Sequence, residues 1–103
     1  MNAVSFKQLN LAPAQQEALQ AMGYTAMTSV QAQSLPLILK GRDVIVRAKT
    51  GSGKTRAFGI GLLNGINPRF FGTQALVLCP TRELADQVGA EIRRLASRMP
   101  NIK

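Results

Sequence analysis

The sequence predicts an α/β fold in which parallel strands are flanked by helices. Two short apolar segments, 43–47 and 74–79, have the composition of strands that are buried on both faces. Each is followed by a loop and then by a helical pattern, over residues 54–63 and from Thr81 onward. Strands that alternate with helices in this way are typical of a parallel sheet. The 103 residues, of which 46% are apolar, form one small globular domain at most.

Two further helices are expected before the first apolar segment. Proline suits the first position of a helix, so Pro13 opens the first one, and Gly23 can end it. The second helix begins after Thr28 and ends at the Lys-Gly pair that precedes the apolar segment. In the last helix, which Thr81 can cap, apolar residues recur at helical spacing and Pro100 marks the end. That apolar stripe consists of Leu84, Val88, Ile92, Leu95 and Met99.

The segment after the first apolar run has the composition of a phosphate-binding loop. Glycines let the backbone curl around phosphate oxygens, and the next helix points the positive end of its dipole at the same place. Lys54 can then reach the β- and γ-phosphates of a nucleotide, and the Thr55 hydroxyl can ligate Mg²⁺. The general pattern G-x-x-x-x-G-K-[ST] has glycine where this chain has Ala48. The loop consists of Ala48, Lys49, Thr50, Gly51, Ser52, Gly53, Lys54 and Thr55.

Thr28 and Gln31 allow two interpretations. The pair has the spacing of a capping box, in which the Gln31 side chain accepts a hydrogen bond from the backbone N–H of Thr28. Alternatively, the Gln31 amide offers one donor and one acceptor to a base. Adenine presents N6–H₂ and N7, whereas guanine presents two acceptors at that edge, so one amide can prefer ATP to GTP.

Three sequence blocks, in order along the chain, resemble those of the DEAD-box RNA helicases. The loop has the form A-x-T-G-S-G-K-T, with the alanine of that family at position 48, and Pro80 begins the sequence P-T-R-E-L-A. Upstream, Tyr24 and the segment 27–31 resemble the Q motif, with which that family recognises adenine. Phe6 lies 25 residues before Gln31, where the family carries an aromatic residue. The resemblance covers nearly the whole chain and is closest to the bacterial DbpA-like subgroup.

The resemblance implies a partial RecA-like P-loop NTPase domain that uses ATP and Mg²⁺ and contacts RNA. It divides the chain into an N-terminal helical segment with the Q motif, 1–41, and the start of the first RecA-like domain, 42–103. It assigns Lys54 and Thr55 to catalysis, and Thr55 to the metal as well. The residues that it assigns to ATP, besides the loop, are Phe6, Tyr24, Thr28 and Gln31. Those that it assigns to the RNA backbone are Pro80, Thr81 and Arg82.

Two of these positions, Phe6 and Arg82, also have simpler interpretations, and one further residue beside the loop has none. Phe6 can stack on the base or anchor the N-terminal segment in the core. Arg82 can hold RNA phosphates or form a surface ion pair with Glu83 or Asp86. Arg56, which directly follows the loop, receives no role from the sequence.

The carboxylates with which this family hydrolyses ATP are not in the sequence. Asp-Glu-Ala-Asp does not occur, and neither does the Ser-Ala-Thr block or a second RecA-like domain with its arginine finger. Because phosphoryl transfer needs metal, water and charge stabilisation together, we expect this part alone to be inactive. The expected parent is an ATP-dependent RNA helicase that acts on structured, ribosomal RNA. The alternatives are another P-loop NTPase and a truncated, non-catalytic module that binds nucleotide or RNA.

The charge balance favours polyanionic partners. The chain has 13 Lys and Arg residues against 5 Asp and Glu residues, a formal charge of +8. The excess can equally reflect an acidic remainder of a longer protein. No apolar stretch is long enough to span a membrane and no signal peptide is evident, so we expect a cytoplasmic protein without a membrane partner. With no His and a single Cys, no zinc site is expected.

Overall fold

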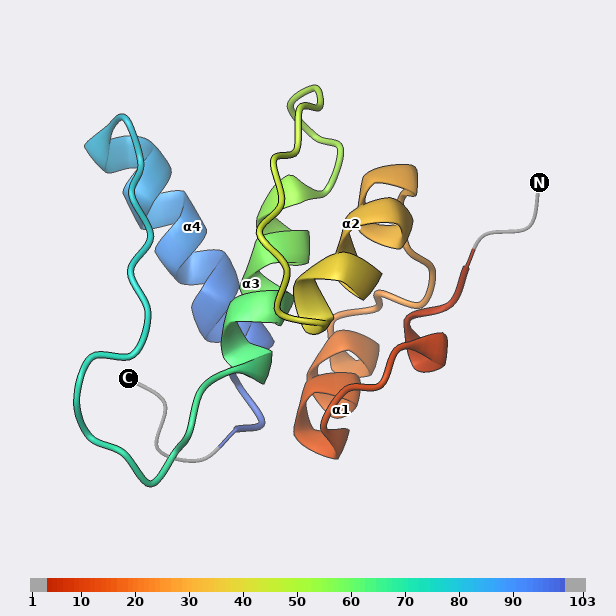
Figure 1. The fold of residues 1–103 in the computed structure, drawn as a ribbon, viewed down its shortest axis with the longest axis horizontal. Coiled ribbons are helices and arrows are strands. Elements are labelled where there is room, and N and C mark those ends of the chain that lie inside the picture. The colour runs from red at the N-terminus through yellow and green to blue at the C-terminus, as the bar shows by residue number, and fades with distance from the viewer. Residues whose placement is uncertain (1–3, 100–103) are drawn as a thin grey trace.

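The computed structural model describes residues 4–99 and consists of helices joined by loops and extended segments (Figure 1). Helix α3 packs between α2 and α4, and α1 lies against α4 and against a short 3₁₀ helix, η1. The N-terminal ends of α2, α3 and α4 lie toward the same end of the molecule. The elements are η1 (Phe6–Gln8), α1 (Pro13–Ala21), α2 (Ser29–Leu39), α3 (Lys54–Asn64) and α4 (Arg82–Leu95).

The helix starts follow from local capping chemistry, as the sequence predicts. Pro13 occupies the first turn of α1, and Gly23 follows the end of that helix with a φ of 81°. Thr28 and Thr81 cap α2 and α4, each accepting a hydrogen bond from a backbone N–H of the first turn. Gly53 caps α3 in the left-handed conformation. The predicted roles of Pro13, Gly23, Thr28 and Thr81 are confirmed, as is the predicted start of α3 at Lys54.

Helix α4 ends earlier than the sequence predicts. Its last residue is Leu95, and the following turn closes with a bond from Ser97 N–H to the Arg94 carbonyl, three residues back. Such tight bonds satisfy carbonyls that the helix leaves free, and they turn the chain so that Met99 packs on the core from outside the helix. The helical stripe therefore stops short of Met99, and Pro100 lies outside the described residues.

One hydrophobic core unites the two predicted segments 1–41 and 42–103. Residues of the first segment pack directly against residues of α3 and the end of α4. Inside this core, the buried Gln15 side chain of α1 donates a hydrogen bond to the Ile60 carbonyl of α3, at 3.1 Å. The buried members of the core are Phe6, Leu19, Met27, Leu35, Ala57, Ile60, Leu63, Leu95 and Ala96.

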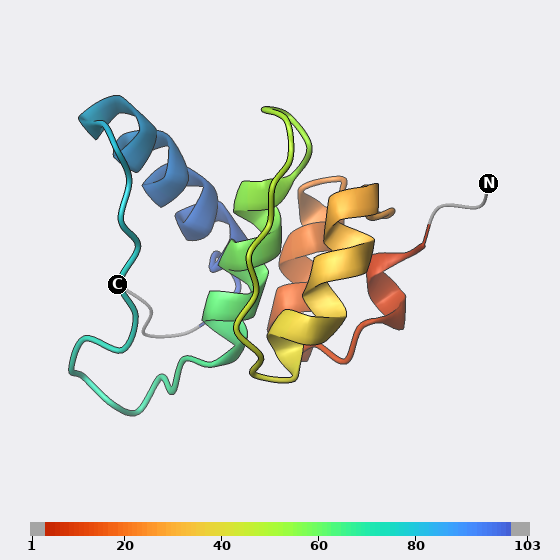
Figure 2. The ribbon, with the colours of Figure 1, turned by 45° about the horizontal axis from the view of Figure 1, so that its top comes forward.

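The two expected strands do not form a sheet within residues 4–99. Segments 43–47 and 74–79 carry no strand assignment, they run apart in Figures 1 and 2, and the β-bridge that occurs joins Ser5 to Ala26. Their apolar side chains are also not buried as predicted, since Ile45 is 92% exposed and Leu78 is 85% exposed. A strand needs a neighbour for its N–H and C=O groups, and these two segments do not provide one for each other.

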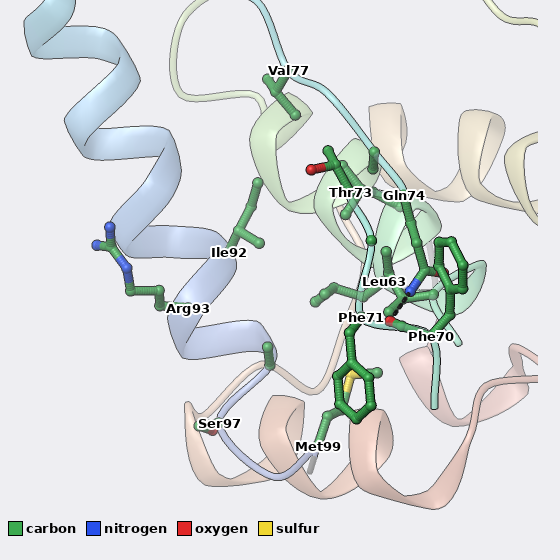
Figure 3. A pocket seen from close by; sticks show the side chains of 15 residues that line it. Leu63, Phe70, Phe71, Thr73, Gln74, Val77, Ile92, Arg93, Ser97 and Met99 are labelled. Carbon is green, nitrogen blue, oxygen red and sulfur yellow. Dashed lines mark hydrogen bonds between the residues drawn. The ribbon is translucent and has the colours of Figure 1, made fainter. Parts of the chain in front are cut away.

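A hollow of about 720 Å³ lies between the ends of α3 and α4 and the segment that leads into 74–79 (Figure 3). Leu63, Ile92 and Met99 contribute apolar lining, and Phe70 and Phe71 stand at its side with 60% and 90% exposure. The turn that carries these two rings is closed by the Gln74 side chain. No helix among the described residues combines the length and the apolar character needed to cross a bilayer.

Candidate nucleotide-binding site

The predicted phosphate loop forms a tight bend at the N-terminal end of α3, where Figure 2 shows it beside the start of α2. Gly51 and Gly53 have φ values of 85° and 90°, a region that glycine enters without steric cost. A hydrogen bond from Ser52 N–H to the Lys49 carbonyl, at 3.2 Å, closes the bend. The loop therefore leads directly into the helix whose first N–H groups have no intrahelical partner.

The Lys54 side chain folds back over the loop. Its ammonium Nζ donates to the Ala48 carbonyl at 2.6 Å, so the charge lies above the bend rather than in solvent. The Ser52 hydroxyl is buried without a hydrogen-bond partner among the described residues. Unpaired donors, a helix N-terminus and a lysine together can hold an anion. This geometry suits the phosphates of a nucleotide.

The start of α2 is bonded to the loop at two points. The Thr28 hydroxyl donates to the Ser52 carbonyl at 2.7 Å, and Gln31 Nε2 donates to the Gly53 carbonyl at 3.1 Å. The same two side chains also form the capping box, with Gln31 Oε1 accepting from Thr28 N–H at 2.9 Å. Gln31 thus serves the helix cap and the loop together, and its side chain is fully buried.

The capping-box interpretation is therefore confirmed, and the adenine interpretation stays a prediction. In this conformation one donor and the acceptor of the Gln31 amide are used within the protein. An amide retains a second N–H and a second lone pair, but full burial keeps them from a base unless the segment 28–31 moves. Base recognition by Gln31 thus requires a local rearrangement.

Gly53 is required by contact as well as by backbone conformation. A Cβ built on Gly53 would collide with the Gln31 amide and would lie 3.0 Å from the Thr28 hydroxyl. At Gly51, with a similar φ, nothing lies within 4 Å of the same position. The close approach of α2 to the loop therefore depends on the missing side chain of Gly53.

Phe6 lies in the core, which is the position of an anchor. Its ring is 2% exposed, and its carbonyl accepts a bond from the Gln16 side chain at 3.0 Å. Tyr24 is half-buried, and the guanidinium of Arg56 lies over its ring, 3.3 Å from the centroid. The structure thus gives both aromatic residues intramolecular partners, and their stacking on a base stays a prediction.

Arg56 is the site residue that sequence reasoning missed. Besides stacking on Tyr24, its Nη2 lies 3.3 Å from Oε1 of Glu91 in α4. Glu91 also accepts a 2.7 Å hydrogen bond from Arg94, which together with the opposite charge raises the pKa of Arg94. The one signal in the sequence is a cation directly after the phosphate loop, and its position does not indicate a contact with Glu91.

Pro80, Thr81 and Arg82 lie exposed at the N-terminal end of α4, on the same end of the molecule as the loop. Thr81 Oγ1 accepts from the Leu84 N–H at 3.1 Å, so its capping role is confirmed. The ion pairs found within residues 4–99 do not include Arg82, and the predicted alternative pairing with Glu83 or Asp86 is not formed. Its guanidinium is available to an anion.

The protein supplies few groups to a metal ion. No group of three or more His, Cys, Asp or Glu side chains that could hold a metal occurs in the described part of the chain. Thr55, in the first turn of α3, offers a hydroxyl beside the bend. Mg²⁺ commonly binds through one or two protein groups plus phosphate oxygens and water, so this donor set fits a nucleotide-bound Mg²⁺.

A glycine-rich bend that opens a helix and carries a lysine defines the phosphate-binding arrangement of P-loop NTPases. The chain belongs to one family of that class, the DEAD/DEAH box helicases, whose profile matches residues 28–103. It is 63% identical over 100 residues to the ATP-dependent RNA helicase DbpA of Escherichia coli. It is 46% identical over 92 residues to the DEAD-box ATP-dependent RNA helicase CshA of Bacillus subtilis.

These alignments cover most of this chain and a small part of each relative. They include 96% and 89% of this chain, but 22% of DbpA and 19% of CshA, so the chain spans about a fifth of their length. The predicted family is thereby confirmed, and so is the N-terminal region of the family as the part that this chain resembles.

Solved structures confirm the predicted fold class. A DEAD box protein from Methanococcus jannaschii matches with a TM-score of 0.85 and 38% identity, over 92% of this chain and 26% of that one. S. cerevisiae Dbp5 bound to RNA and ADP BeF3 matches with a TM-score of 0.90 and 34% identity, over 94% and 25%. The helices and the loop therefore have the arrangement of part of a RecA-like domain, although the sheet is not formed within residues 4–99.

Proposed function

We propose that this chain binds ATP through the loop 48–55 and contributes to an ATP-dependent RNA helicase. The observation that carries the proposal is the loop itself, in which the Lys54 ammonium, the buried Ser52 hydroxyl and the start of α3 converge. These groups are donors, and the phosphates of ATP are acceptors that would satisfy them. Mg²⁺ bound to those phosphates would be held by Thr55 and would neutralise their charge.

RNA is the second proposed partner. Arg82 lies exposed at the N-terminal end of α4 and makes no ion pair with the described acidic residues, which suits a phosphate of the RNA backbone. The net charge of +8 supports a polyanionic partner, as does the likeness to Dbp5, a protein solved with RNA. The proposal extends to structured, ribosomal RNA as the substrate and to a cytoplasmic protein that acts in ribosome biogenesis, which is the context that the sequence resemblance implies.

Hydrolysis of ATP is proposed for the longer helicase and not for this chain alone. Lys54 and Thr55 would hold phosphate and metal in that reaction, but the Asp-Glu-Ala-Asp segment expected to position metal and water does not occur in this sequence. The chain therefore supplies nucleotide binding and RNA contact. In the full helicase these two functions would be combined with the residues that activate water.

The ratio of ATP to GTP affinity tests the role of Gln31. Gln31→Ala should lower the free energy of unfolding by about 1–3 kcal/mol, because the Thr28 N–H and the Gly53 carbonyl lose their partner. If Gln31 also reads adenine, the ratio of the two dissociation constants should fall toward one. Fluorescence titrations with N-methylanthraniloyl-ATP and the corresponding GTP analogue measure it.

The matched control for this experiment is Gln33→Ala. Gln33 belongs to the same helix, is exposed and bonds only the Ser29 hydroxyl, so stability and nucleotide preference should stay near those of the unchanged protein. An ATP/GTP ratio that does not change in Gln31→Ala, together with a lowered melting temperature, would restrict Gln31 to the helix cap.

The salt dependence of RNA binding tests Arg82. Arg82→Ala should weaken binding to RNA oligomers of different sequence alike and should reduce the slope of log K against log salt by about one contact. Fluorescence anisotropy at several salt concentrations measures both quantities. Arg69→Ala removes an exposed arginine far along the chain from the site and serves as the charge-matched control. A loss confined to one RNA sequence would contradict a phosphate contact.

A further inference from the structure

Arg56 connects three elements that meet behind the phosphate loop. It is the third residue of α3 and directly follows Thr55. Its guanidinium lies 3.3 Å from the centroid of the Tyr24 ring, and its Nη2 lies 3.3 Å from Glu91 Oε1 in α4. One side chain therefore links the helix of the loop to the segment before α2 and to the middle of α4.

The contact between Arg56 and Glu91 is sheltered from solvent, so water screens the attraction between their charges only weakly. The side chains of Arg56 and Glu91 are 19% and 13% exposed, whereas the second partner of Glu91, Arg94, is 60% exposed. Both ion pairs found within residues 4–99 use Glu91, in a protein with only 5 acidic residues against 13 basic ones. A sheltered cation with one carboxylate and one aromatic face has few alternative positions.

The hydrogen bonding of Arg56 is nevertheless incomplete. Its Nε is buried without a partner. Glu91 Oε1 lies close to Nη2 as an opposite charge, but the two atoms do not form a hydrogen bond. Unpaired buried polar atoms lower stability, so this arginine stabilises the fold less than a fully hydrogen-bonded or apolar side chain would. Fold stability alone would be served as well by an apolar side chain of similar length.

Tyr24 lies at the start of a segment that also contacts the phosphate loop directly. Four residues beyond it, Thr28 donates to the Ser52 carbonyl, and Gln31 donates to the Gly53 carbonyl. The segment from Tyr24 to Gln31 is therefore held to the loop by Thr28 and Gln31 and held to α3 by Arg56. Loss of either set of contacts would allow this segment to move relative to the phosphate loop.

We propose that Arg56 is a positioning residue for the nucleotide site. It holds Tyr24 and α4 in a fixed position relative to α3, so that the phosphate loop is prearranged for the phosphates of the nucleotide. The planar guanidinium can stack on a ring and face a carboxylate at the same time, which neither lysine nor an apolar side chain does. This inference rests on the proposed binding of ATP to the loop.

Arg56→Met separates positioning from stability. Methionine retains much of the side-chain length, and Glu91 keeps Arg94 as a partner, so no lone buried charge is created and the melting temperature should hold or rise. The dissociation constant for N-methylanthraniloyl-ATP should nevertheless increase about 5- to 10-fold, because prearrangement of the phosphate loop is lost. Hydrogen exchange should become faster at residues 24–28 and in α4.

Two further variants make the test specific. Arg94→Met removes the exposed partner of the same carboxylate and leaves the contacts of Arg56 with Tyr24 and Glu91 in place, so affinity and exchange should stay unchanged. Arg56→Lys retains the charge without the planar stack and should give an intermediate affinity, about 2- to 4-fold weaker. Unchanged affinity and unchanged exchange at residues 24–28 in a folded Arg56→Met would overturn the proposal.

Failure of ATP binding as such gives a different result. If the unsubstituted chain does not bind the ATP analogue, the proposed function fails, and Arg56 is then judged by hydrogen exchange without nucleotide. Faster exchange at both residues 24–28 and α4 in Arg56→Met, relative to Arg94→Met, would support the positioning role. Equal exchange in the two variants would refute it.

Discussion

Lys54→Ala is expected to remove ATP binding almost completely while leaving the fold intact. The ammonium lies over the bend of the loop, 2.6 Å from the Ala48 carbonyl, where it would meet phosphate oxygens. A hydrogen bond to a charged group contributes about 1.5–3 kcal/mol, and contacts to two phosphates would make the loss about 100-fold or more. Titration of the fluorescent ATP analogue measures the affinity.

The control for Lys54→Ala is Lys40→Ala, at the exposed end of α2. Both variants lower the net charge by one, so a general effect of charge would appear in both. Because Lys54 is only partly buried, its replacement should change the free energy of unfolding by less than about 1 kcal/mol. Retained affinity in a folded Lys54→Ala would show that the nucleotide binds elsewhere.

The parts of the fold that the sequence predicted correctly are those set by local chemistry. Pro13, Thr28 and Thr81 start their helices at the predicted positions, because a helix cap is a property of a few neighbouring residues. The same holds for the capping box of Gln31. Local rules of this kind do not depend on which elements meet in space.

The strands were not predictable in the same way, since a sheet requires a neighbour. Segments 43–47 and 74–79 have strand composition, yet Ile45 and Leu76 are 92% and 80% exposed, and neither segment pairs within residues 4–99. Composition indicates that a segment suits a sheet, but pairing depends on which segments lie side by side. The likeness to RecA-like domains confirms the fold class through the helices and the loop instead.

The Arg56 contacts show the same limit at the site. Tyr24 lies in the segment before α2, Arg56 in α3 and Glu91 in α4, and no spacing or motif joins these residues. Gln31 shows a different limit, because one residue satisfies both interpretations of its pattern. The sequence predicts its capping role from Thr28, but the bond to the Gly53 carbonyl depends on how α2 and the loop pack.

Gly53→Ala is expected to be the most damaging single substitution in the loop. The left-handed conformation that Gly53 adopts at a φ of 90° destabilises alanine by about 1–2 kcal/mol. Its Cβ would also displace the Gln31 amide, which leaves buried polar groups unpaired at a further cost of about 1–3 kcal/mol. Thermal unfolding should therefore shift down by roughly 10 °C or more for a domain of this size.

The difference between Gly53→Ala and Gly51→Ala isolates the steric part of that loss of stability. Gly51 has a similar φ of 85° in the same loop but nothing within 4 Å of the added Cβ, so it should lose only the conformational term. A second comparison keeps the test decisive if Gly53→Ala folds poorly. In a Gln31→Ala background the colliding amide is gone, so adding Gly53→Ala should cost little more than Gly51→Ala does. Equal losses for Gly53→Ala and Gly51→Ala in the unsubstituted background would mean that the contact between α2 and the loop does not constrain this position.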